Sequence, residues 1–394
     1  MNTRNRFLAA IAFALSACAV GCGDDSSSND GCRESGPGRC LGLFTDAPGT
    51  LEADGTTTYE FTIDQGPACV EGDPFRTFYR PPSSGSSDTL LLFLPSGGAW
   101  LPTGSPLMTA GTQAPARLSL AAPHPSFDAN HPEIGPHHLI YVPPCDGSVF
   151  AGDRDYTAAD LAALNALSLV PRFYRGARNV SASIDVAKQH IPNPSRVIIS
   201  GSGAGSMGAI LAIFTIHNAF PDAKIIVIQD GSTGIAHGEA YPDFVADLLD
   251  RWSILKNMPT GCDGCNQLGH LTPYVRFALE MIPNLRIGTY QATNETTLPL
   301  FIAGSPNTPK LDKDDWRCEI LNETRKLVEL FPDRYGAFIV DQSATSYAQL
   351  EGAGDYEIDG YSYHDWLSAL LSPTEAPLAL SETPLTDLDA CPYR

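Results

Sequence analysis

Basic side chains are scarce in this chain of 394 residues. It carries 25 lysine and arginine residues against 45 aspartate and glutamate residues, which gives a formal net charge of −20 at pH 7. Nucleic-acid binding depends on cations that neutralise phosphates, so this balance argues against a nucleic-acid partner. The same charge would repel a strongly anionic polymer unless a local basic patch intervenes.

Long apolar runs are also missing, except near the N-terminus. Arg4 and Arg6 precede an apolar run over residues 7–17, which is the pattern of an export signal. No other stretch is long and apolar enough to span a bilayer. We therefore expect a lipoprotein signal peptide over residues 1–22.

Two cysteines compete for the lipidated position. Leu-Ser-Ala-Cys, ending at Cys18, resembles a bacterial lipobox, and Ala-Val-Gly-Cys, ending at Cys22, is a second candidate. Cleavage before Cys22 removes Cys18 and lipidates Cys22, so that eight of the ten cysteines remain for disulfides, whereas cleavage before Cys18 leaves nine. Either choice predicts a membrane-anchored bacterial lipoprotein, periplasmic or on the cell surface, that touches the membrane only through its N-terminal lipid.

The polar stretch 23–31 has almost nothing apolar to bury, so we expect a disordered tether before a domain over residues 32–394. That domain alternates short apolar runs with helical patterns. The predicted strands are 59–63, 75–79, 89–94, 138–142, 196–199, 224–228, 285–290 and 337–340. The predicted helices are 158–169, 177–190, 207–216, 241–252, 314–330 and 364–371. This alternation predicts a single α/β domain with a mainly parallel central sheet and helices on both faces.

One stretch carries most of the functional information. The buried strand 196–199 runs into Gly201-Ser202-Gly203-Ala204-Gly205, and a helix follows. Strand, tight glycine turn and helix are the setting of the nucleophile elbow, whose usual form is Gly-x-Ser-x-Gly. Gly203 stands at the position of the central serine, so the elbow lacks its nucleophile.

Several motifs together resemble the pectin acetylesterase and Notum carboxylesterase family. They are Cys69-Val-Glu-Gly-Asp-Pro, Ser96-Gly97-Gly98-Ala99-Trp100, Tyr141-Val-Pro-Pro-Cys145-Asp-Gly147 with Gly152-Asp153, Gly176-Ala-Arg-Asn179, and Asp359-Gly360 with Asp365-Trp366-Leu367. The resemblance covers roughly residues 69–371. It implies an α/β-hydrolase-like fold and hydrolysis of carboxylic esters, such as acetyl groups on pectin, by a serine, an aspartate and a histidine.

The resemblance places these three catalytic positions on residues without the required chemistry. The serine falls on Gly203, the aspartate on about Asn294 and the histidine on Ala344. No histidine lies between His270 and His364, so the loss of the base does not depend on fine alignment. The catalytic triad is therefore expected to be lost in a divergent member of the family.

The remaining parts of the site are expected to be kept. The resemblance assigns the oxyanion-binding backbone N–H groups to Gly97, Gly98 and Ala204. Trp100 is expected either in the core or as a wall of the pocket.

Two nearby serines offer a different reading, in which a displaced hydroxyl acts as nucleophile. Ser202 precedes the turn's apex, where its side chain would normally point away from the pocket. Ser206 lies a turn into the helix, where a hydroxyl is more often an N-cap. Asp230 follows a strand. It is either a catalytic acid or an ordinary residue of an Asp-Gly turn.

No cofactor and no metal are expected. His131, His137 and His138 lie near one loop, but no carboxylate or cysteine cluster at ligand spacing accompanies them. Cys32 and Cys40 bracket a loop that a disulfide would close. The family resemblance and the exported context predict a structural disulfide between Cys262 and Cys265.

The sequence thus supports two functional hypotheses and leaves open whether the chain is an enzyme. In the first, a pseudoenzyme binds a carbohydrate ester, an acyl ligand or a partner at the vestigial site. In the second, an active carboxylesterase or deacetylase uses Ser202 or Ser206. A third, weaker hypothesis is a surface scaffold.

Overall fold

The computed structural model describes residues 31–97, 99–102, 113–116, 118, 131–231, 249–265, 270–295, 313–344, 346–347 and 356–385. The predicted signal peptide with Cys18 and Cys22, nearly all of the predicted tether, Gly98 and most of the predicted helix 241–252 lie outside the described residues. Residues Gly31–Arg394 form one compact unit.

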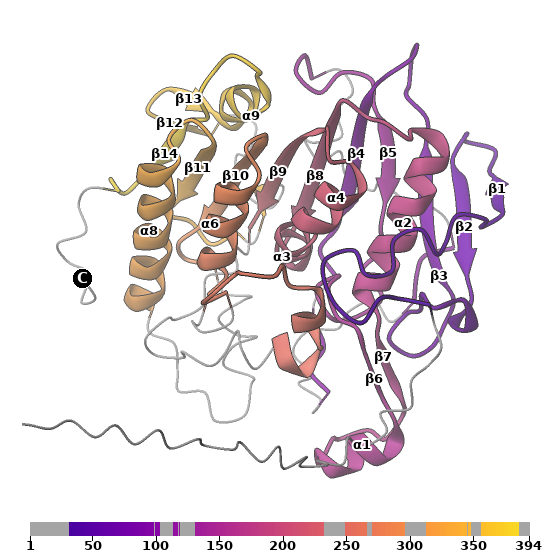
Figure 1. Cartoon of the computed structure of the whole chain (residues 1–394). Helices are drawn as coiled ribbons and strands as arrows, with labels where there is room; N and C mark the ends of the chain where they lie inside the picture. The colour runs from indigo at the N-terminus through magenta and orange to yellow at the C-terminus, as the bar shows by residue number, and fades with distance from the viewer. Residues whose placement is uncertain are drawn as a thin grey trace, which may run out of the picture. The chain divides into compact units, whose positions relative to one another are not determined.

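A ten-stranded sheet forms the centre of this unit, with strand order β1-β2-β3-β5-β4-β8-β9-β10-β11-β14 (Figure 1). The strands are β1 (Gly49–Leu51), β2 (Thr57–Phe61), β3 (Phe75–Arg80), β4 (Thr89–Leu94), β5 (His138–Tyr141), β8 (Arg196–Ser202), β9 (Lys224–Asp230), β10 (Leu285–Ala292), β11 (Tyr335–Val340) and β14 (Ala379–Ser381). From β5 to β14 all neighbours pair in parallel, whereas β1, β2 and β3 form an antiparallel edge that pairs with β5. The predicted mainly parallel α/β fold is confirmed.

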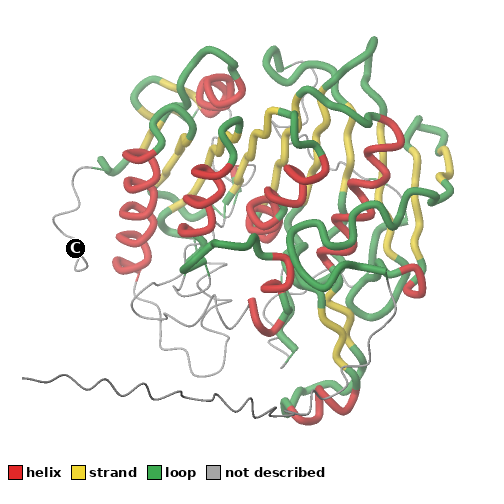
Figure 2. The backbone as a smooth tube through the Cα atoms, in the orientation of Figure 1, coloured by secondary structure: helices red, strands yellow, loops and turns green. Residues whose placement is uncertain are grey.

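Most of the helices pack against this sheet, in one layer beside the strands, whereas the helix over residues 158–163 packs against a small hairpin away from the sheet (Figure 2). They are α1 (Ala158–Ala163), α2 (Gly176–His190), α3 (Ala204–Leu211), α4 (Ile213–Ala219), α6 (Thr272–Met281), α8 (Lys313–Leu330) and α9 (Tyr363–Leu371). Short 3₁₀ turns occur at η1 (Ile63–Gln65) and η3 (Ile254–Asn257), and small two-stranded sheets at β6 (Arg154–Tyr156) with β7 (Arg172–Tyr174) and at β12 (Glu357–Ile358) with β13 (Tyr361–Ser362).

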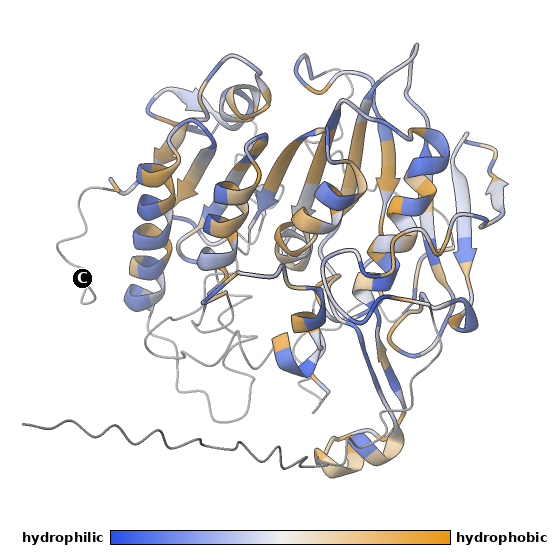
Figure 3. Cartoon of the chain, in the orientation of Figure 1, coloured by the Kyte–Doolittle hydropathy of each residue, from blue (hydrophilic) through white to orange (hydrophobic). Residues whose placement is uncertain are grey.

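The central strands are apolar on both faces, as their colouring in Figure 3 shows. In β4, Leu90 and Leu92 pack in a core cluster with α2, α4 and α6, whereas Leu91 and Phe93 pack in another cluster with α9. Alternate side chains of a strand point to opposite faces, so one strand serves both clusters. This burial explains why these strands appear in the sequence as continuous hydrophobic runs.

Several boundaries differ from the sequence-based prediction for local reasons. The predicted helix 207–216 is two helices, α3 and α4, which meet at Ala212, and α3 begins at Ala204, directly after the glycine turn. The predicted helix 158–169 ends early, because Leu164 caps α1 and Asn165 adopts a positive φ of 53°. The hairpin β6–β7 was not predicted, since each of its strands has only three residues.

Disulfides bracket several loops of the unit. Cys32–Cys40 and Cys262–Cys265 are both formed, as the sequence predicts. A further disulfide, Cys69–Cys145, joins the segment before β3 to the segment after β5. Stable disulfides are typical of proteins that fold outside the cytosol, so they indicate an exported protein. Within the described residues, no helix has both the length and the apolar character to cross a membrane.

Candidate functional site

The turn between β8 and α3 has the backbone geometry of a nucleophile elbow. Gly203 has φ 55° and ψ −121°, and the helix starts at the next residue. Its N–H donates a 2.9 Å hydrogen bond to the carbonyl oxygen of Asp230, which fixes the turn to the end of β9. A side chain at this φ is strained, by about 1–3 kcal/mol. Glycine at the apex adopts the same conformation without that strain.

Gly201 and Gly205 flank the apex, and both must be glycine because other backbone segments pack directly against them. A Cβ on Gly201 would lie 2.0 Å from the carbonyl oxygen of Gly205. A Cβ on Gly205 would lie 1.8 Å from the carbonyl oxygen of Leu94, at the end of β4. The Gly-x-Gly-x-Gly spacing therefore marks a tight packing of the elbow against the neighbouring strand.

Ser96 occupies the space into which the apex side chain would point. A Cβ on Gly203 would lie 2.6 Å from the Ser96 Oγ and 3.1 Å from the Ser96 Cβ. Ser96 belongs to the glycine turn after β4, and its side chain is exposed. Ser96 is not among the nucleophiles predicted from the sequence, which were Ser202 and Ser206. The available signal was its place in a glycine turn that directly follows a buried strand.

The two serines proposed as displaced nucleophiles differ in exposure. The Ser206 hydroxyl is fully buried and donates a 2.7 Å hydrogen bond to the Gly201 carbonyl oxygen. Ser202 is the last residue of β8, is half-buried and lies opposite Asp230 in the register with β9. Ser202 and Ser96 thus have more access to solvent than Ser206.

The backbone groups assigned to the oxyanion hole lie around this turn. A Cβ on Gly97 would lie 1.9 Å from the Cβ of Pro144, so only glycine fits there without a shift. Ala204 opens α3, and the first N–H groups of a helix have no acceptor within it. Gly98 lies outside the described residues.

Trp100 lies just beyond the glycine turn and is half-buried. The Arg172 guanidinium is 4.5 Å from the centre of the Trp100 ring, a cation–π distance. The Trp100 N–H donates to Gly147 and its carbonyl oxygen accepts from the Trp252 indole. Trp100 is therefore held firmly beside the turn.

The position expected for the catalytic aspartate lies in the turn after β10. Asn294 is exposed there, and its side-chain amide donates a 3.0 Å hydrogen bond to the Asp341 carbonyl oxygen. The carboxylate of Asp341 pairs with Arg317 at 2.8 Å and accepts from the Thr293 hydroxyl at 2.7 Å. The carboxylate that follows β11 is thus engaged with a guanidinium rather than with an imidazole.

The position expected for the catalytic histidine is packed into the core. Ala344 is 6% exposed and belongs to the apolar cluster that includes Tyr290, Tyr347 and Tyr363. The Tyr347 and Tyr363 rings stack with centroids 3.8 Å apart, and the Tyr347 N–H donates to the Asp230 carboxylate at 2.6 Å. This packing fixes the segment after β11 through aromatic contacts.

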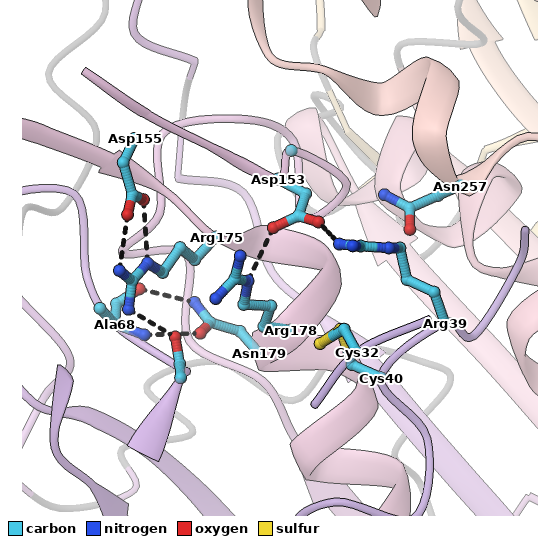
Figure 4. Close-up of polar contacts among 12 residues, drawn as sticks. Cys32, Arg39, Cys40, Ala68, Asp153, Asp155, Arg175, Arg178, Asn179 and Asn257 are labelled. Atoms are coloured by element: carbon cyan, nitrogen blue, oxygen red, sulfur yellow. Dashed lines mark hydrogen bonds and ion pairs between the residues drawn. A yellow bond between two sulfur atoms is a disulfide. The ribbon is translucent and has the colours of Figure 1, made fainter. Parts of the chain in front are cut away.

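Ion pairs explain several of the family-like motifs as structural. Asp153 is buried and pairs with Arg178 at 2.7 Å and also with Arg39 (Figure 4). Asn179 accepts from the Ala68 N–H and donates to the Ala68 carbonyl oxygen, both at 3.0 Å. These contacts bind α2 to the segments before β3 and before β6. The contacts of the motif residues Asp153, Arg178 and Asn179 are therefore structural.

The histidines considered as metal ligands have other partners. His137 Nδ1 lies 2.9 Å from the Gly135 carbonyl oxygen, and His138 Nδ1 lies 2.8 Å from the Tyr79 hydroxyl. His131 stacks on His364 and lies 3.5 Å from the Ser368 hydroxyl. In the part of the chain that the structure describes, no three His, Cys, Asp or Glu residues are grouped so as to hold a metal ion.

Comparison with known protein families agrees with this geometry. The family model of pectinacetylesterase matches residues 55–262, slightly more than half of the chain. The match extends from within the loop before β2 to Cys262, and so it contains the Ser96 turn, the buried Asp153–Arg178 pair and the elbow at Gly203. It ends before Asn294 and Ala344. The fold, the elbow and this match together show that the chain belongs to the pectinacetylesterase family.

Proposed function

We propose that this protein is a pectinacetylesterase-family member that has lost ester hydrolysis and binds an acylated ligand, such as a carbohydrate ester, at the former active site. The carrying observation is the elbow at Gly203, which keeps its backbone conformation and has no side chain to act as nucleophile. Acyl transfer by this fold needs a serine Oγ, an adjacent base and a group that orients the base.

The surroundings of the elbow support the proposal. Removing a complete triad lowers turnover by about a million-fold and leaves roughly 10³–10⁴-fold over water from the oxyanion hole and binding. The segment after β11, where the histidine would stand, is packed around Ala344. The glycine turn at Gly97 and the start of α3 at Ala204 supply backbone N–H groups that can bind an ester carbonyl without cleaving it.

A direct test measures binding and cleavage in the same sample. An acetylated oligosaccharide is titrated into the purified chain while NMR follows ligand line-broadening and released acetate. We expect binding without acetate release above the buffer control. Ser96→Trp places a bulky ring at the mouth of the elbow and should abolish binding, whereas Ser84→Trp, in the exposed turn after β3, should not. Equal binding by the two variants would contradict a ligand site at the elbow.

One observation favours a second candidate function, an active carboxylesterase with a displaced serine. The Ser96 Oγ is exposed and lies beside the apex where the nucleophile would stand. A substitution of this serine separates the two functions. Acetate release that disappears in Ser96→Ala would establish the esterase and exclude the pseudoenzyme.

We also propose that the chain is held at a bacterial membrane by a lipid on Cys18 or Cys22. The lipobox-like sequence before Cys18 and the even cysteine count after cleavage at Cys22 support the two choices. Mass spectrometry of the N-terminal peptide from cells would identify the modified cysteine. Replacement of that cysteine by alanine should release the protein from the membrane fraction, and retention of a double Cys18→Ala, Cys22→Ala variant would contradict the proposal.

A further inference from the structure

A cavity lies at the amino edge of the parallel strands. Its volume is about 450 Å³, and its lining includes the first residues of four neighbouring strands: Thr89 of β4, Arg196 of β8, Lys224 of β9 and Leu285 of β10. The elbow follows the opposite, carboxyl end of β8. The cavity is therefore separate from the site described above.

The charge of this cavity is opposite to that of the whole chain. Its lining contains four cationic residues, Arg196, Lys224, Arg286 and Arg334, and one acidic residue, Asp88. The chain as a whole carries a net charge of −20. Among the described residues, none of the four cations forms an ion pair with a carboxylate. A cleft lined by one sign of charge concentrates counter-ions of the other sign.

Backbone carbonyls hold the three arginines in place without neutralising their charge. Arg196 donates to the carbonyl oxygens of Glu133 and Ile134, at 2.7 and 2.9 Å. Arg286 donates to carbonyls at the end of α9, and Arg334 to the Leu279 carbonyl at 2.6 Å. Burial lowers the pKa of the Arg196 and Arg286 guanidinium groups, and this effect outweighs that of the nearby acids.

Lys224 differs from these arginines because its side chain is exposed at the cavity and the described residues offer it no acceptor. The acidic lining residue, Asp88, is already engaged by the Ser195 hydroxyl at 2.5 Å. Lys224 is therefore the cation most available to an incoming ligand.

Neutral polar and apolar groups complete the lining. Ser195, Asn284 and Ser372 supply hydroxyl and amide groups, and Pro283 and Pro373 supply apolar surface. We propose that this cavity binds an anionic carbohydrate, a sugar that carries a carboxylate or a phosphate. The cations attract the anionic group through charge-assisted hydrogen bonds, and the hydroxyl and amide groups contact the sugar hydroxyls. This inference does not depend on the function proposed for the elbow.

Isothermal titration of the purified chain tests the proposal with four probes: a galacturonate trisaccharide, glucose 6-phosphate, neutral maltotriose and inorganic phosphate. We expect one of the two anionic sugars to bind and the neutral trisaccharide not to bind. Lys224→Gln should weaken that binding about fivefold, since it removes one ligand-facing charge. Lys224→Arg should restore it, and Arg154→Gln, which removes one charge from the distant β6–β7 hairpin, should leave it unchanged.

The outcomes separate the two possible sources of the anion. Tighter binding of the trisaccharide identifies a sugar acid, and tighter binding of glucose 6-phosphate identifies a sugar phosphate. Binding of inorganic phosphate alone, equal binding of the neutral sugar, or binding of the anionic sugars that is identical in the chain and in Lys224→Gln would overturn the proposal. Because Lys224 is remote from Gly203, each of these results leaves the account of the elbow unaffected.

Discussion

Ser96 and Gly203 face each other at the elbow, with the Ser96 Oγ only 2.6 Å from the point that a Cβ on Gly203 would occupy. A serine in the glycine turn and a serine at the apex would compete for one space. The glycine at the apex is therefore coupled to the position of the Ser96 side chain.

This coupling can be measured by a double-mutant cycle. Gly203→Ser should lower the free energy of unfolding by about 1–3 kcal/mol, because a serine there has a positive φ and contacts Ser96. Ser96→Gly in the same chain should recover part of that loss, since it removes the contact. Urea denaturation of the two single variants and the double variant gives the coupling energy. Additive effects would show that the two side chains do not share the space.

Gly205→Ala should destabilise the protein by about 3 kcal/mol or more, because the new Cβ would lie 1.8 Å from a backbone oxygen that cannot rotate away. Gly360→Ala is the matched control. Gly360 has φ 80° and open space around it, so its substitution carries backbone strain of only about 1–2 kcal/mol. Equal losses in thermal or urea unfolding would contradict the tight packing of the elbow.

Asp153→Asn should lower the free energy of unfolding by about 3–5 kcal/mol, because it removes a buried carboxylate that pairs with both Arg178 and Arg39. Asp155→Asn breaks the pair with Arg175 at a position where the carboxylate is 37% exposed. Arg175 is itself buried but keeps the carbonyl oxygens of Ile63 and Gly66 as acceptors, so this control should lose clearly less, about 1 kcal/mol. Urea denaturation measures both losses. Equal losses in the two variants would contradict the structural role of the buried Asp153 carboxylate.

Stability should fall as the pH is lowered through 6.5. Burial lowers the pKa of four histidines from this value: His137, His138, His190 and His270. Below pH 6.5 the unfolded chain binds protons at these histidines that the folded chain does not, and this difference favours unfolding. The contribution is fully present above 6.5 and is lost as the pH falls towards the lowered values.

The variant His137→Asn isolates one of these contributions from the other titrating groups. Its free energy of unfolding should change less steeply between pH 7.5 and 5.5 than that of the unmodified chain. The slope measures the protons taken up on unfolding, so the two slopes should differ by the equivalent of up to one proton. Parallel curves for the two proteins would mean that His137 titrates alike in the folded and unfolded states.

The sequence predicted those parts of the structure that depend on local patterns. Buried strands such as β4 and the glycine spacing around Gly203 follow from periodicity and turn chemistry, and the predicted bounds of β4 match the observed ones. The sequence did not reveal the contact of Ser96 with the elbow, because the two residues come from different segments of the chain. Only the parallel pairing of β4 with β8 brings them together.

The cavity at the amino edge of the sheet could not be predicted from the sequence either. Arg196, Lys224, Arg286 and Arg334 are scattered through the sequence, and none stands in a basic run. They meet because parallel strands begin at one edge of the sheet, while long connections carry the chain back to that edge. The net negative charge of the whole sequence therefore gave no sign of this local concentration of positive charge.

We propose that the elbow at Gly203 does not hydrolyse esters. The most direct measurement is the hydrolysis of a chromogenic acetate ester by the purified, folded chain beside Ser96→Ala, Ser202→Ala and Ser206→Ala. We expect hydrolysis no faster than the uncatalysed background, and no change of this rate in any of the three variants. Clear turnover that one of these substitutions abolishes would contradict the account and identify the nucleophile.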